Sequence, residues 1–155
     1  MHWVTLPLKR YAEFRGRSRR LEFWSFQLAV IVIYVVLFFL MMGGIPFAEL
    51  ASDNPDPNAF GDMGILFWIG WGLLALFVLA IFVPSLAVTV RRLHDRNMSG
   101  WWYGGLLIAS FIPIVNVVAI FGYLALLVIL LLPGTEGPNR YGPDPKDASQ
   151  AGVFE

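Results

Sequence analysis

The chain has 155 residues, enough for one domain, and 57% of them are hydrophobic while only 14% are charged. Soluble domains average about 45–50% apolar and about 25% charged residues, so both values indicate a membrane protein. The sequence has no cysteine, which excludes disulfides, thiolate metal sites and a cysteine nucleophile. Its net charge is zero, and no generally basic surface suggests nucleic acid as a partner.

Residues 1–22 form a basic flank in which six residues are Lys or Arg and two are Glu. Leu8, Tyr11 and Phe14 recur at three-residue spacing, which predicts a short helix from about Pro7. Such a helix would lie in the membrane interface with its arginines toward lipid phosphates. The alternative is a solvated flank that only orients the protein.

The first membrane span is predicted at residues 23–42, a run of 20 residues without a charge. A helix of this length reaches about 30 Å, the thickness of the hydrocarbon core of a bilayer. The run is longer than the core of a secretory signal, and no cleavage site follows it, so we predict a retained span. Trp24 lies at its first turn, where an interfacial aromatic anchor is expected.

A proline-rich loop and a second apolar run come next. Residues 43–62 contain four acidic residues and no Lys or Arg, which predicts an irregular acidic linker. Residues 63–90 carry no charge over 28 positions and predict a long or tilted second span. Within this span, Gly70 and Gly72 favour a close approach of another helix, and Pro84 predicts a kink.

The run 100–132 is too long for one straight span, because 33 helical residues would extend about 50 Å. We predict two short helices, 100–112 and 117–132, joined by a turn at Pro113–Asn116. The alternative is a single third span that is kinked. In the first case, the two tryptophans Trp101–Trp102 would anchor the short helix at the lipid headgroups.

The distribution of charge predicts the orientation. Lys and Arg collect in the 1–22 flank and at Arg91–Arg96, whereas the 43–62 loop has none. Under the positive-inside rule the N-terminus is cytoplasmic and the acidic loop is outside. The tail, 133–155, is predicted to be irregular, and it returns to the cytoplasm if 100–132 is a hairpin. The predicted fold is therefore all-α and polytopic, with a transmembrane domain at 23–132 that contains four membrane helices, the third short, or three with the last kinked.

Enzymatic interpretations of the His94-Asp95 pair find little support. A metal-dependent phosphohydrolase needs several more His and Asp ligands, and the only other histidine is His2. Ser99 lies near His94, but the Gly-x-Ser-x-Gly motif of a serine hydrolase is absent. The predicted spans also lack the charged residues that mark the path of a proton-coupled carrier.

Local ion pairs are expected around Asp95. Arg91 lies four residues before it and Arg92 three residues before it, so both pairings suit a continuing helix. Glu22 and Asp95 would then neutralise arginines across a helix contact and fix packing. Alternatively, the arginines of the two helix ends attract an anionic headgroup, at about 1 kcal/mol per basic residue near an anionic leaflet.

Three segments match the motifs of a known family in the family's order. They are Phe14-Arg15-Gly16-Arg17-Ser18-Arg19-Arg20-Leu21-Glu22-Phe23-Trp24, Arg91-Arg92-Leu93-His94-Asp95 with Ser99-Gly100-Trp101-Trp102, and Gly134-Thr135-Glu136-Gly137-Pro138-Asn139-Arg140-Tyr141-Gly142. Over about residues 8–145 the chain resembles the bacterial inner-membrane family called domain of unknown function 805. The resemblance implies a small polytopic inner-membrane protein and implies no activity.

We therefore predict a non-enzymatic, multi-pass protein of the bacterial inner membrane, with no metal, no cofactor and no catalytic residue. Its cytoplasmic face is predicted to bind anionic lipid headgroups or a protein partner, a second copy of the chain included. A small channel or transporter and an enzyme acting on lipid headgroups are the alternatives. The predicted face consists of Arg15, Arg17, Arg19, Arg20, Glu22, Arg91, Arg92, His94, Asp95, Arg96, Asn139 and Arg140.

Overall fold

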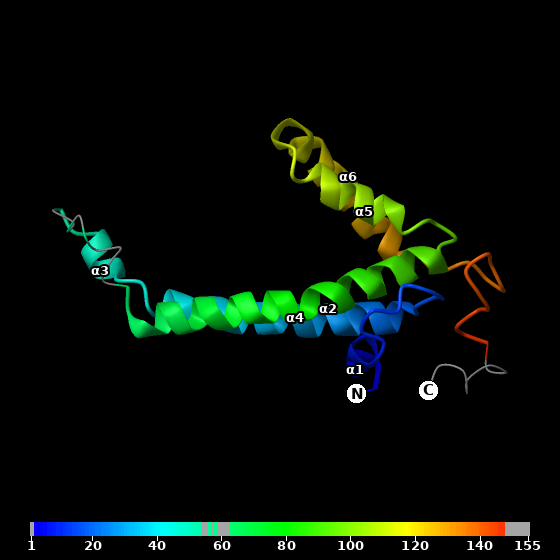
Figure 1. Cartoon of the computed structure of the whole chain (residues 1–155), viewed down its shortest axis with the longest axis horizontal. Coiled ribbons are helices and arrows are strands. Elements are labelled where there is room, and N and C mark those ends of the chain that lie inside the picture. Colours follow the sequence, from blue (N-terminus) through cyan, green and yellow to red (C-terminus); the bar gives the residue numbers. More distant parts are fainter. Residues whose placement is uncertain (1, 54–55, 57, 59–62, 148–155) are drawn as a thin grey trace. The chain divides into compact units, whose positions relative to one another are not determined.

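A computed structural model describes residues 2–53, 56, 58 and 63–147, and this part of the chain is helical, with no strand beyond one isolated bridge between Asn139 and Gly142 (Figure 1). The chain divides into two compact units, Met1–Gln27 with Val83–Glu155, and Leu28–Phe82. The helices are α1 (His2–Lys9), α2 (Arg20–Met42), α3 (Phe47–Leu50), α4 (Ile65–Asp95), α5 (Trp101–Ala109) and α6 (Pro113–Leu131).

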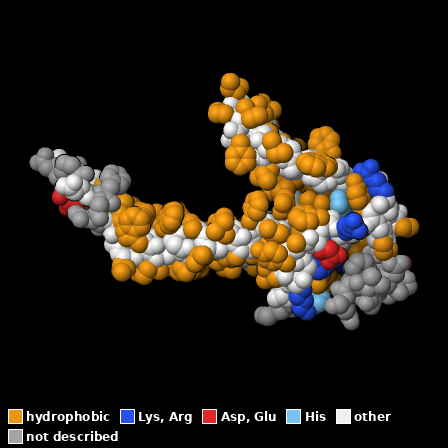
Figure 2. Space-filling model, in the orientation of Figure 1, with side chains coloured by type: hydrophobic (Ala, Val, Ile, Leu, Met, Phe, Trp, Pro, Cys, Tyr) orange, Lys and Arg blue, Asp and Glu red, His pale blue; other side chains and the backbone are white. Residues whose placement is uncertain are grey.

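Three of the described helices, α2, α4 and α6, are long and apolar enough to cross a membrane. In the space-filling view, hydrophobic side chains cover the long helices, while charged side chains gather near the end of α4 (Figure 2). The all-helical prediction is therefore confirmed with three candidate spans. The predicted fourth span is not supported, because α5 has only nine residues and would extend about 14 Å.

Several predictions differ from the structure. The linker at 43–62, predicted to be irregular, contains the short helix α3 in its described part. The helix of the basic flank covers His2–Lys9 and does not start near Pro7, because the backbone that follows it turns to bring two carbonyls to Arg91, as described below. In the predicted hairpin the break lies at residues 110–112, just before Pro113. Proline suits the first position of a helix, since it lacks the N–H that would be unpaired there, and it therefore begins α6.

The end of α4 is set by Asn97, which has a positive φ of 59°. The N–H of Met98 donates to the carbonyl of Leu93 at 3.0 Å, and the N–H of Asn97 donates to that of His94 at 2.9 Å. This is the pattern in which a left-handed residue closes a helix and satisfies its last carbonyls. It fixes Asp95 at the end of the helix, beside the chain's other charged segments.

In the unit Leu28–Phe82, the second part of α2 packs against the first part of α4. The rings of Tyr34 and Phe77 meet edge to face with centroids 5.2 Å apart. A Cβ built on Gly70 would lie 2.8 Å from the backbone nitrogen of Met41, so glycine is what allows this approach. A Cβ on Gly72 would meet nothing within 4 Å. Of the two glycines expected to allow close packing, only Gly70 does so.

These two glycines give a matched test of the packing. Gly70→Ala is expected to lower the free energy of unfolding by about 1–3 kcal/mol, because the added methyl group pushes the two backbones apart. Gly72→Ala adds the same methyl group to open space and should leave stability unchanged or slightly raised. Thermal unfolding of both variants in lipid nanodiscs measures the difference, and equal midpoints would contradict the close approach at Gly70.

Candidate functional site

Asp95, the last residue of α4, lies between two buried arginines. The Nη2 of Arg17 is 2.9 Å from Oδ1 of Asp95, and an Nη1–Oδ2 ion pair joins Arg92 to the other oxygen. The three side chains are no more than 4% exposed. Removing charges from water costs several kcal/mol per ion. The attraction between the Asp95 carboxylate and its two guanidinium partners offsets this cost.

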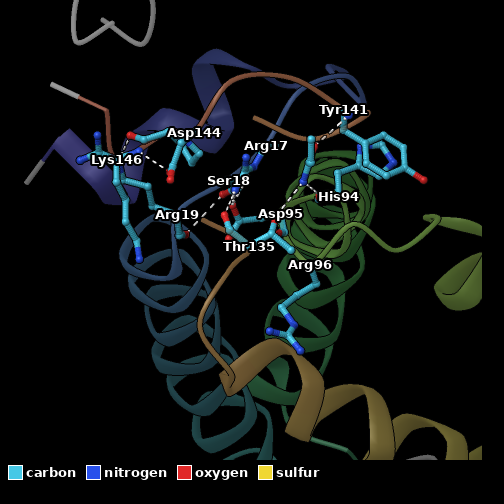
Figure 3. A network of polar contacts seen from close by, with 12 residues as sticks. Arg17, Ser18, Arg19, His94, Asp95, Arg96, Thr135, Tyr141, Asp144 and Lys146 are labelled. Carbon is cyan, nitrogen blue, oxygen red and sulfur yellow. Dashed lines mark hydrogen bonds and ion pairs between the residues drawn. The ribbon is translucent and has the colours of Figure 1, made fainter. Parts of the chain in front are cut away.

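The remaining donors of Arg17 hold the C-terminal tail (Figure 3). Its Nη1 donates to the carbonyl of Gly137 at 2.6 Å and its Nη2 to that of Thr135 at 2.5 Å. Thr135 also donates its backbone N–H and its hydroxyl to the carbonyl of Asp95, at 2.9 and 3.1 Å. A Cβ on Gly134 would lie 2.0 Å from Oδ2 of Asp95. The tail therefore packs directly on the Arg17–Asp95 pair.

Arg91 connects α4 to the start of α2 and to the basic flank. Its Nη2 is 3.1 Å from Oε1 of Glu22, and both side chains are buried. Its Nη1 donates to the carbonyl of Arg10 at 3.3 Å and to that of Glu13 at 2.5 Å, which explains why α1 ends before these residues. The carbonyl of Arg91 accepts a bond from the N–H of Ser18 at 3.2 Å.

A third group of arginines binds the end of α6. The last carbonyls of a helix have no partner within the helix, and they carry the negative end of its dipole, so cations there are favourable. Arg92 donates through Nε to the carbonyl of Leu130 at 3.2 Å and also to that of Leu132. Arg20 donates to the carbonyl of Leu131 at 3.3 Å, and Arg96 to that of Pro133. Arginines from α2 and α4 thus hold the chain where α6 ends.

His94 belongs to the same assembly of contacts. Its ring stacks on Tyr141 with centroids 3.8 Å apart and planes 5° from parallel. Its Nδ1 is 3.2 Å from the carbonyl of Gly16, and its own carbonyl accepts a bond from the Asn139 amide at 2.9 Å. Among the residues that the structure describes, no group of three or more His, Asp or Glu side chains has an arrangement that could hold a metal.

The end of the described tail is ordered by Asp144. Its Oδ1 accepts a bond from the backbone N–H of Lys146 at 2.9 Å, and its Oδ2 accepts one from that of Gly137 at 3.0 Å. Both N–H donors lower the pKa of the Asp144 carboxyl because they stabilise its charged form, and the N–H of Lys146 has the larger effect. The same segment meets the start of α2, where Nε of Arg19 donates to the carbonyl of Pro145.

The predicted face therefore has two parts. Five of its residues are buried and paired within the protein, and we call them the clamp: Arg17, Glu22, Arg91, Arg92 and Asp95. Arg15, Arg20 and Arg140 are exposed, and Arg19, His94, Arg96 and Asn139 are half-buried. Arg140 donates to the carbonyl of Asn97 at 2.9 Å. Of the predicted anchors, Trp101 and Trp102 are exposed, and Trp24 is half-buried with its ring against Phe23.

Sequence reasoning missed several residues that complete the clamp. Gly134 and Thr135 touch it, Tyr141 stacks on the neighbouring His94, and each of the three lies in the third family motif. That motif was the only available signal for them. Trp3, whose ring lies 5.4 Å from the guanidinium of Arg19, carried no signal at all, because it stands alone in a short helix.

Beside the clamp lies a groove of about 270 Å³, which we call the basic groove. It is lined by four cationic side chains, by Asp95 with Gly134, and by the apolar side chains of Trp3 and Leu21. The cations are Arg19, Arg20, Arg92 and Lys146. Because the Asp95 carboxylate is already shared by Arg17 and Arg92, the groove retains an excess of positive charge. It combines this charge with an apolar wall.

The described part of the chain is helical, and three of its helices are able to cross a membrane. Buried arginine–carboxylate pairs join the ends of α2 and α4, and arginine–carbonyl hydrogen bonds add the end of α6, which together define a small helical membrane protein. The chain belongs to the family described as protein of unknown function DUF805, whose model matches residues 11–143. All three motifs fall in this range, and the structure brings them together at the clamp.

Relatives agree with this assignment. The chain is 34% identical to the inner membrane protein YhaI of Escherichia coli K12 over 149 residues, which is 96% of this chain and 99% of YhaI. It is 36% identical to the inner membrane protein YhaH of the same strain over 148 residues, 94% of this chain and 98% of YhaH. The uncharacterized protein YiiR is 32% identical over 114 residues. No solved structure matches the chain.

Proposed function

We propose that this chain is a non-enzymatic, multi-pass protein of the inner membrane whose cytoplasmic face binds the headgroup of an anionic lipid. Its relatives YhaI and YhaH are named inner membrane proteins. The basic flank and the acidic 43–62 loop support a cytoplasmic N-terminus. The hydrogen bonds from Arg17 to Thr135 and Gly137 support a tail on the same side as the flank.

The basic groove is the observation that carries this proposal. Three of its cations come from the ends of α2 and α4 and the fourth from the tail, so the groove exists only when these segments are joined. A phosphate group is attracted to such a cluster, and an interfacial tryptophan favours the level of the headgroups. Trp3 and Leu21 would contact the glycerol and upper acyl region while Arg20 and Lys146 reach the phosphate.

The clamp arginines are poor choices for testing lipid binding. Arg91 and Arg92 are completely buried, and their removal would break the packing of the helices. Arg20 and Lys146 are exposed at the groove, so their side chains can be shortened with less effect on the core. Lys9 and Arg140 are also exposed and do not line the groove, so they give a control with the same change of charge.

The double variant Arg20→Ala with Lys146→Ala is expected to bind a short-chain phosphatidylglycerol about 30-fold more weakly than the unchanged protein. At about 1 kcal/mol for each basic residue the loss is about 2 kcal/mol, and 1.4 kcal/mol corresponds to a factor of ten. Titration of the detergent-solubilised protein, followed by native mass spectrometry, measures the affinity.

The control variant Lys9→Ala with Arg140→Ala should retain most of that affinity, and short-chain phosphatidylcholine should bind weakly to all three proteins. An equal loss in both double variants would mean that only the net charge matters and that the groove is not a site. An unchanged affinity in the Arg20 and Lys146 variant would refute headgroup binding and leave a protein partner as the remaining candidate for this face.

A further inference from the structure

Both ends of the α5–α6 hairpin lie at the clamp. α5 starts at Trp101, shortly after α4 ends at Asp95. At the other end, Arg92 and Arg20 bind the carbonyls of Leu130 and Leu131 in the last turn of α6. The chain therefore leaves the clamp through α5 and returns to it through α6, and the two helices pack against each other (Figure 1).

The lengths of the two helices are unequal. With nine residues α5 extends about 14 Å, whereas α6 has 19 residues and extends about 28 Å. The hydrocarbon core of a bilayer is about 30 Å thick. If α6 crossed this core, α5 and the short turn after it would have to carry the chain the whole way across first. They are too short to do so, and both ends of the hairpin are held at one place.

The turn between the helices is built for an apolar environment. Phe111 is 82% exposed and Ile114 is 87% exposed, so the tip presents large hydrophobic side chains outward. Apolar side chains of this size on a hairpin tip need a partner, and the tip offers no charge to select a soluble one. Lipid chains are the matching partner.

Several polar groups of the turn are satisfied from within. The amide of Asn116 donates to the carbonyl of Ser110 at 2.9 Å. The N–H groups of Phe111 and Ile112 donate to carbonyls of the last turn of α5, both at 3.1 Å. The hydroxyl of Ser110 lies 3.2 Å from that of Tyr123. Irregular backbone inside a membrane requires such internal partners, because hydrocarbon supplies none.

We propose that the α5–α6 hairpin is a re-entrant element whose tip lies among the acyl chains. It enters the membrane from the side that carries the clamp, ends within the hydrocarbon, and returns to the same side. Only α2 and α4 cross from one side to the other. The arginines that bind the end of α6 hold the base of the hairpin at the headgroups, while Phe111 and Ile114 contact lipid chains at its tip.

The cysteine-free sequence makes the test direct, since one introduced thiol is the only one present. Phe111→Cys and Ile114→Cys replace exposed side chains. Both thiols are expected to stay unlabelled by a membrane-impermeant maleimide in spheroplasts and in inverted membrane vesicles, and to react fully after detergent solubilisation. Ser52→Cys and Glu136→Cys, also at exposed positions, should each be labelled in one preparation only, and in opposite ones.

Two results would overturn the proposal. Labelling of Phe111→Cys or Ile114→Cys in the preparation that labels Ser52→Cys would mean that the tip reaches the opposite side and that α6 crosses the membrane. Labelling in the preparation that labels Glu136→Cys would mean that the hairpin lies on the membrane surface. The failure of lipid binding at the basic groove would leave these outcomes unaffected, because the labelling does not depend on that groove.

Discussion

Replacing Asp95 by asparagine is expected to lower the free energy of unfolding by about 3–5 kcal/mol, the usual cost of removing one partner from a buried ion pair. Asparagine has nearly the same shape, so the change removes a charge and leaves no large cavity. Arg17 and Arg92 would then remain buried without their shared carboxylate. The asparagine amide would also direct an N–H₂ donor toward guanidinium groups, which have no acceptor for it.

An exposed ion pair in the basic flank provides the control for Asp95→Asn. Arg10 and Glu13 are joined at 2.6 Å, but the Glu13 side chain is 49% exposed. Glu13→Gln is therefore expected to cost about 0–1 kcal/mol. The carbonyl of Glu13 that accepts from Arg91 is untouched by this change. Reversible unfolding in mixed micelles compares the two variants, and a loss for Asp95→Asn no larger than that for Glu13→Gln would refute the clamp as a source of stability.

The membrane helices could be predicted from the sequence because the signal is local. Charge-free runs of 20 and 28 residues mark α2 and most of α4, and Pro113 separates α5 from α6. The predicted fourth span is not supported, for a physical reason. Pro113 begins α6 instead of lying in the turn, which lengthens α6 and leaves nine residues for α5.

The clamp could be predicted only in part. The spacing of Arg91 and Arg92 from Asp95 allows both pairings, and the structure selects Arg92. Arg91 instead forms an ion pair with Glu22, which lies 69 positions earlier in the chain. No local pattern encodes that choice, because it depends on which helix ends meet. The same holds for Arg17, whose main-chain acceptors lie about 120 residues further along the chain.

The arginines therefore fall into two groups, those paired inside the protein and those exposed at the basic groove, and the sequence does not distinguish the two. Those of the clamp pair with carboxylates and donate to main-chain carbonyls, so their partners lie within the protein. Arg20 binds a carbonyl of the same helix end at 3.3 Å but remains exposed at the groove. A ligand in the basic groove would meet Arg20 and Lys146, and would meet the clamp only through Arg92 and Asp95, which line the groove.

Gly134→Ala is expected to release the tail while it leaves the ion pairs in place. The new methyl group would lie 2.0 Å from Oδ2 and 2.6 Å from Cγ of Asp95. Asp95 cannot move away, because two arginines hold it, so the tail must shift instead. Overpacking of this kind costs about 1–3 kcal/mol. If opening of the tail becomes easier by this free energy, trypsin cleavage after Arg140 should become about 5- to 140-fold faster, with 1.4 kcal/mol for each factor of ten.

Gly105→Ala is the matched control, since a Cβ at Gly105 meets nothing within 4 Å. Its cleavage rate after Arg140 should equal that of the unchanged protein, and equal rates in all three proteins would contradict the close contact of Gly134 with Asp95.

Gly134→Ala should also weaken the binding of phosphatidylglycerol, because the released tail carries Lys146 out of the basic groove. Asp95→Asn disturbs the ion pairs themselves and should lower both global stability and tail protection. If Gly134→Ala speeds cleavage of the tail but leaves the unfolding midpoint nearly unchanged, the ion pairs of the clamp are stable without the tail bound to them.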